Sequence, residues 1–96
     1  MGVTIYVEDY LGEVLLRDPT DMRDLLEAAE SLGLPLLTSV DVYDDTRFNR
    51  RQSERLVSEV DALSGQRDLT PAIAALQVAI SLVGERPHRY LMFNGD

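Results

Sequence analysis

The feature that most limits the fold is the segment 72–83, which would be apolar on almost every side as a helix. Between Ala72 and Val83 the only polar residues are Gln77 and Ser81. Such a helix has to be covered on most of its surface, by the protein core or by a second chain. A chain of 96 residues has limited cover to give. We therefore expect this helix to lie in the core, with part of it buried in a homodimer.

Patterning before this segment predicts a hairpin followed by a helix. Residues 3–8 alternate between apolar and polar side chains, and residues 13–17 return after a turn at Gly12. Beyond them, apolar residues recur every three or four positions. This period predicts a helix that opens at Asp18, which would cap it, and ends at Gly33.

The rest of the chain completes the predicted fold. Residues 34–43 are apolar between turn-forming residues, which predicts a buried third strand. Asn49 and Gln52 have the spacing of a capping box, so a second helix should begin near residues 46–49. Residues 88–93 predict a final strand. We expect an α/β fold of the α+β type: one domain, residues 1–96, with a single mixed sheet of about four strands and three helices, in the order β-β-α-β-α-α-β.

The chain is strongly acidic, since seventeen Asp and Glu residues against nine basic ones give a net charge of −8. Such a surface repels phosphate backbones and anionic lipid, so we expect binding neither to nucleic acid nor to a membrane. It favours a basic protein partner, which the negative field would steer toward it. A charge of this size also keeps a small domain soluble, and that simpler explanation stays open.

Composition narrows the chemistry further. The sequence has no cysteine and only one histidine, His88, which excludes disulfides, thiolate metal sites and two-histidine metal sites. We expect no cofactor and no catalytic residue, because His88 has no nucleophile or orienting carboxylate near it in the sequence. All nine basic residues are arginine, which indicates a GC-rich bacterial genome. Residues 1–9 have neither the cationic start nor the apolar stretch of a signal peptide, so we expect a cytoplasmic protein.

The densest group of polar residues, 41–52, follows the predicted third strand and runs into the predicted second helix. Three interpretations stay open for it. Its aspartates could bind a divalent cation, within a ligand-binding domain or small enzyme that uses the 41–49 loop. They could instead cap the helix and pair with the neighbouring arginines. The third interpretation is a partner-binding surface, for which the candidates are Asp41, Tyr43, Asp44, Asp45 and Arg47.

Several segments resemble a group of small uncharacterised bacterial proteins of similar length. The resemblance rests on residues 34–37, on residues 41–52, and on short matches at residues 4–6, 87–91 and 95–96. In size and acidity the chain also resembles immunity proteins that neutralise toxins, and the barstar type of nuclease inhibitor. This second resemblance implies a function but assigns no residue.

The charge and this resemblance lead to one leading hypothesis: a non-enzymatic protein that binds and neutralises a basic partner, such as a toxin or a nuclease. A subunit that only assembles with its own copies, through the third helix or an edge strand, is the structural alternative.

Overall fold

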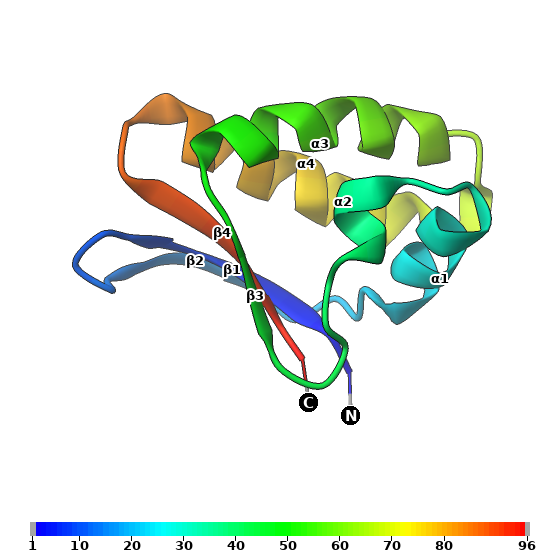
Figure 1. The fold of residues 1–96 in the computed structure, drawn as a ribbon, viewed down its shortest axis with the longest axis horizontal. Coiled ribbons are helices and arrows are strands. Elements are labelled where there is room, and N and C mark those ends of the chain that lie inside the picture. Colours follow the sequence, from blue (N-terminus) through cyan, green and yellow to red (C-terminus); the bar gives the residue numbers. More distant parts are fainter. Residues whose placement is uncertain (1, 96) are drawn as a thin grey trace.

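The computed structural model describes residues 2–95, without the side chain of Arg67. The four strands are β1 (Thr4–Asp9), β2 (Val14–Asp18), β3 (Asp45–Phe48) and β4 (Arg89–Asn94). The helices are α1 (Arg23–Ser31), α2 (Pro35–Thr38), α3 (Arg50–Leu63), the short 3-10 helix η1 (Arg67–Leu69) and α4 (Thr70–Glu85). All four strands form one sheet in the order β2-β1-β4-β3, and the helices lie over one of its faces (Figure 1). The predicted α+β class and the order of strands and longer helices are confirmed.

The sheet is antiparallel throughout, so the prediction of a mixed sheet is wrong. The reason is the pair of long helices between β3 and β4. In Figure 1, α3 leads away from the end of β3 and α4 returns to the same side. Because two helices bring the chain back to where it left the sheet, β4 runs opposite to β3.

The predicted strand at residues 34–43 is also wrong: this segment contains α2, and the third strand follows later, at Asp45–Phe48. Pro35 suits the first turn of a helix, where its missing N–H is not needed. Leu37 and Val40 are buried at a helical spacing of three rather than in alternation. The apolar alternation that predicts a strand is weak in β3, because only two of its residues turn toward the helices. These are Thr46 and Phe48, in register with Phe93 and Leu91.

The helix starts show one correct prediction and one wrong one. At α3 the capping box is present: the Asn49 side chain accepts from Gln52 N, and the Gln52 side chain accepts from Asn49 N, both at 2.9 Å. At α1, Asp18 is still part of β2 and does not cap the helix. Instead Asp21 Oδ1 accepts from Arg23 N at 3.0 Å and from Val3 N at 3.2 Å, which ties the helix start to the first strand.

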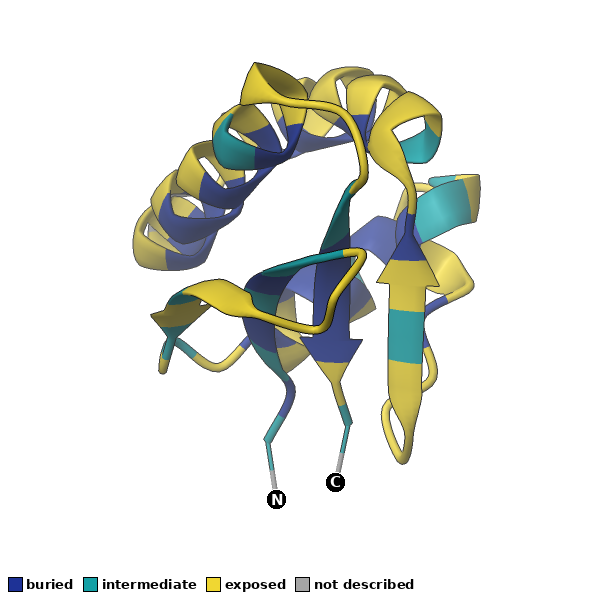
Figure 2. Cartoon of the chain, turned by 90° about the vertical axis from the view of Figure 1, so that its left-hand side faces the viewer, coloured by how far each residue is buried: buried dark blue, intermediate teal, exposed yellow. Residues whose placement is uncertain are grey.

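The two faces of the sheet differ sharply. Figure 2 shows buried residues on the sides of the helices that face the sheet. Under them the strands contribute apolar side chains, namely Ile5, Val7, Phe48, Leu91 and Phe93. The opposite face has no helix over it and carries two arginine–tyrosine pairs. The guanidinium of Arg17 lies 5.1 Å from the Tyr6 ring centre, and that of Arg47 lies 4.7 Å from the Tyr90 ring centre.

The chain itself covers about half of α4, as seven of the helix's sixteen residues are buried. The other side of α4 is exposed along the whole helix, and in its middle it presents Ala74, Gln77, Val78 and Ser81 to solvent. The homodimer therefore stays a prediction, and the exposed side of α4 is the surface that it would use. None of the helices in residues 2–95 is long and apolar enough to cross a membrane.

Candidate functional site

The predicted partner-binding loop joins α2 to β3, which places it at the far end of β3 from the start of α3. None of its aspartates caps α3, because Asn49 does so. The interpretation of these aspartates as caps of that helix is therefore wrong. The loop also precedes its strand, β3, rather than following one.

Two loop carboxylates are instead bound to the loop's own backbone. Asp41 Oδ1 accepts from Tyr43 N at 2.8 Å, and Asp44 Oδ1 accepts from Asp45 N at 2.8 Å. Asp41 N donates to the Thr46 hydroxyl at 2.9 Å, and Gly95 N donates to the Asp44 carbonyl at 3.0 Å. These bonds tie the loop to its own backbone, to Thr46 and to Gly95.

Glycine is required at position 95 for this contact. A Cβ built there would lie 2.6 Å from the Asp41 carbonyl oxygen and 2.6 Å from Asp44 N. These are backbone atoms that cannot swing aside, so the close approach of the C-terminal strand to the loop depends on the missing side chain.

The five predicted site residues fall into two groups. Asp41, Tyr43 and Asp44 lie together in the loop, and the Tyr43 side chain is 81% exposed. Asp45 and Arg47 lie in β3 and share the helix-free face of the sheet, in register with Asn94 and Met92. The structure therefore separates Arg47 from the loop with which the sequence groups it.

On that face Arg47 is already engaged, because its Nη2 donates to Glu8 Oε1 at 3.0 Å. The nearby Tyr6 hydroxyl has a pKa above its ordinary value. Partial burial is the main cause, the charges of Asp45 and Glu8 add to it, and Arg17 and Arg47 act in the opposite direction.

Metal binding finds no support in the loop geometry. Within residues 2–95, leaving aside Arg67, no group of three or more His, Asp and Glu side chains is arranged to hold a metal ion. Asp41 and Asp44 turn to their own backbone, and Asp45 belongs to the sheet face. The three carboxylates do not converge.

A second acidic feature, which the sequence reasoning missed, lies on α1. Asp24, Glu27 and Glu30 follow one another at a spacing of three, and we call them the α1 row. None of them forms an ion pair with any side chain that the structure describes. Like charges at this spacing disfavour a helix, and Glu30 adds a negative charge at the helix's own negative end. The row therefore costs stability.

Beside the row is an apolar hollow of about 290 Å³ between α1 and residues 37–42, which we call the α1 hollow. Leu26, Leu37 and Val40 are buried beneath it, while Glu27 and Glu30 line it from α1. The one cation that lines it, Arg23, already binds Asp21 at 2.9 Å. The hollow thus combines an apolar floor with two uncompensated carboxylates.

The α1 hollow opens next to the predicted loop. Val42, which is flanked in the chain by Asp41 and Tyr43, lines it. Val42 therefore connects the loop to the hollow that Glu27 and Glu30 line. Acidic residues three positions apart on a predicted helix are the sequence signal that could have revealed the α1 row.

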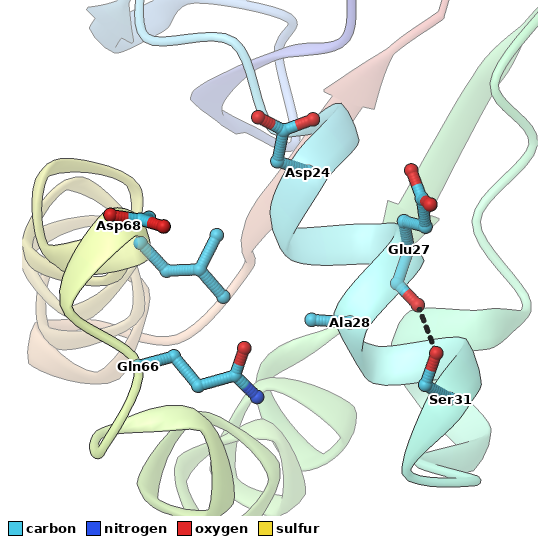
Figure 3. Close-up of a pocket in the computed structure, with 7 residues that line it drawn as sticks. Asp24, Glu27, Ala28, Ser31, Gln66 and Asp68 are labelled. Carbon is cyan, nitrogen blue, oxygen red and sulfur yellow. Dashed lines mark hydrogen bonds between the residues drawn. The ribbon is translucent and has the colours of Figure 1, made fainter.

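A further hollow of about 330 Å³ lies on the other side of α1, against η1. In Figure 3, Asp68 and Gln66 face α1 across this hollow, and the Glu27 side chain projects from α1 away from them. The Ser31 hydroxyl donates to the Glu27 carbonyl at 3.3 Å and so stays within the helix. This side adds Asp24 and Asp68 to the acidic residues around α1.

Glu59 is a charged residue of α3 that the fold buries. It is only 7% exposed. Its Oε2 accepts from Leu36 N at 3.1 Å, and its Oε1 accepts from Leu37 N at 3.0 Å. The carboxylate thereby satisfies the free amides of α2 and fixes residues that form the floor of the α1 hollow.

The single histidine lies just before β4, with a backbone φ of 64°. Its ring is in edge contact with Tyr10, with ring centres 5.6 Å apart. Among the described residues, no side chain is seen to form a hydrogen bond with His88 of the kind that orients a general base.

No family model, no curated protein and no solved structure matches the chain.

Proposed function

We propose that this protein is a non-enzymatic binding domain that neutralises a basic protein partner, such as a toxin or a nuclease. The observation that carries the proposal is the α1 hollow. There Glu27 and Glu30 stand over an apolar floor without an ion-pair partner among the described residues.

A long cationic side chain suits this hollow. Arg and Lys bury an aliphatic stem and keep a charged head at the surface, which matches an apolar floor with acidic edges. Binding of such a side chain would relieve the repulsion within the α1 row. Tyr43 adds an exposed aromatic side chain on an ordered loop, and tyrosines of this kind are enriched among residues that dominate binding energy.

The overall charge supports the same partner class. A net charge of −8 accelerates the approach of a basic protein and opposes nucleic acid and anionic lipid. The proposal includes a bacterial cytoplasmic setting, which rests on the arginine-only basic composition and the absence of cysteine.

The experiment is affinity capture from the source cells with three immobilised proteins. These are the wild type, the variant Glu27→Gln/Glu30→Gln, and a control, Asp61→Asn/Glu85→Gln, which removes two exposed carboxylates from other helices. We expect wild type and control to retain the same basic protein, which the α1 variant loses. Equal retention by all three, or retention of no basic protein, would contradict the proposal.

The loop is tested separately with Asp44→Asn/Asp45→Asn. An amide oxygen at position 44 can still accept from Asp45 N, so this variant should keep its fold. We expect weaker binding of the captured partner, measured by calorimetry with the purified proteins. Full affinity in the folded variant would remove Asp44 and Asp45 from the binding surface.

A further inference from the structure

A hollow of opposite charge lies where α3 begins and α4 ends. In Figure 1 the chain that leaves α4 passes beside the first turn of α3 before it enters β4. The hollow there measures about 290 Å³ and is lined by Asn49, Arg50, Arg51, Pro87, His88, Arg89 and Tyr90. We call it the arginine hollow. Three arginines and the histidine are among its lining residues, which include no Asp or Glu.

Two of these arginines are held in place by the end of α4. Arg50 Nη2 donates to the Gly84 carbonyl at 3.0 Å, and Arg89 Nη1 donates to the Leu82 carbonyl at 2.7 Å. Each bond satisfies a carbonyl in the last turns of the helix. Each arginine has five N–H donors, so donors remain on both side chains. Their charges are therefore positioned before any ligand arrives.

The third arginine, Arg51, is exposed and has no ion pair among the described residues. Arg50 forms only a marginal ion pair, because Glu54 Oε1 lies 3.9 Å from its Nε. Like charges gathered around one hollow repel one another, and an anion between them removes that repulsion. A protein with a net charge of −8 repels small anions elsewhere on its surface.

We propose that the arginine hollow is a binding site for a phosphate group carried on a small organic molecule or on a phosphorylated side chain. Arginine forks match the oxygens of phosphate, and Arg50, Arg51 and Arg89 all line the same hollow. Tyr90 and Pro87 give the hollow an apolar wall against which the organic part can lie. The site is separate from the acidic surface around α1.

The test is an NMR titration of the whole protein, at constant ionic strength, with inorganic phosphate, with phosphoserine blocked at both ends, and with the same blocked serine unphosphorylated. We expect both phosphates to shift the amide signals of residues 49–51 and 88–90, and the serine to shift none. Tighter binding of the phosphoserine derivative would assign the apolar wall to an organic group. Equal binding of the two phosphates would contradict the part of the proposal in which the phosphate is carried on an organic group.

A matched pair of variants makes the test specific. Arg51→Gln removes a charge that lines the hollow, whereas Arg55→Gln removes one a helical turn further along α3 that does not. We expect Arg51→Gln to weaken phosphate binding about tenfold, the effect of losing one charge-assisted contact, and Arg55→Gln to leave it unchanged. Equal losses in both variants, or signal shifts spread evenly over the arginines, would overturn the proposal.

Discussion

The 41–45 loop and the α1 row are both acidic and exposed, but their carboxylates differ in what they bind. In the loop, Asp41 and Asp44 accept hydrogen bonds from neighbouring backbone amides. On α1, the side chains of Glu27 and Glu30 have no ion pair with any described residue. A dense run of aspartates therefore marks an ordered turn here, whereas carboxylates spaced along a helix are the ones free to meet a partner.

The largest expected effect concerns Glu59, the buried carboxylate that binds α2. Glu59→Ala removes the acceptor of two backbone amides, so we expect a loss of about 2–4 kcal/mol in the free energy of unfolding. Glu59→Gln keeps one acceptor oxygen and should lose less. Urea denaturation measures both variants. A loss below about 0.5 kcal/mol in Glu59→Ala would show that α2 does not depend on this carboxylate.

Asp21 should be next in size, because its carboxylate binds two backbone amides and Arg23. We expect Asp21→Ala to cost about 1–2 kcal/mol at neutral pH. Hydrogen bonds from Arg23 lower the pKa of Asp21 from 3.8 to about 2. A lowered carboxyl pKa stabilises the folded state above the unfolded value and loses this effect as the carboxyl becomes protonated.

The stability advantage of wild type over Asp21→Asn should therefore shrink as the pH falls from about 4 to about 2. Because the Asp21 side chain is 45% exposed, added salt should reduce the advantage as well. Urea denaturation across this pH range tests the prediction. An advantage that stays constant through the range would show that the ion pair with Arg23 contributes nothing.

A smaller effect is expected in the loop. Asp41→Ala removes the acceptor of Tyr43 N and should cost about 1 kcal/mol, like the loss of a helix cap. Tyr43→Ala, in which an exposed side chain is removed, should change stability by less than about 0.5 kcal/mol. Thermal melting of the two variants checks the contrast. Equal losses would mean that the Asp41 carboxylate does not order the loop.

The smallest effect on stability should have the opposite sign. Glu27→Gln and Glu30→Gln remove like-charge pairs from α1, so each should raise the free energy of unfolding by about 0.2–0.5 kcal/mol at low salt. High salt should abolish the gain, because it screens the repulsion in the wild type. Denaturation at two salt concentrations measures both. A loss of stability in either variant would show that the row is not under repulsion.

The sequence predicts those parts of the fold in which local chemistry decides the structure. The capping box at Asn49 and Gln52 lies within four residues and is found as predicted. The end of α1 at Gly33 follows from its positive φ of 68°, which glycine adopts freely. Both depend only on neighbours in the chain.

The failures come from contacts between distant residues. Residues 35–38 form a helix that is capped by Glu59, which lies more than twenty positions later. No local pattern reveals that partner, and the same contact turns Glu59 inward. The acidic loop was identified, but its connection to α1 arises only when Val42 and Glu27 line one hollow.

The most direct test of the account is an NMR titration of the protein with a short arginine-rich peptide, in the three forms used for capture. We predict that the largest amide shifts fall on residues around the α1 hollow, namely Leu26, Glu27, Glu30 and Val42. They should disappear in Glu27→Gln/Glu30→Gln and persist in Asp61→Asn/Glu85→Gln. Shifts of similar size at every acidic residue, with equal losses in the two variants, would contradict the claim that this surface is built to bind a basic partner.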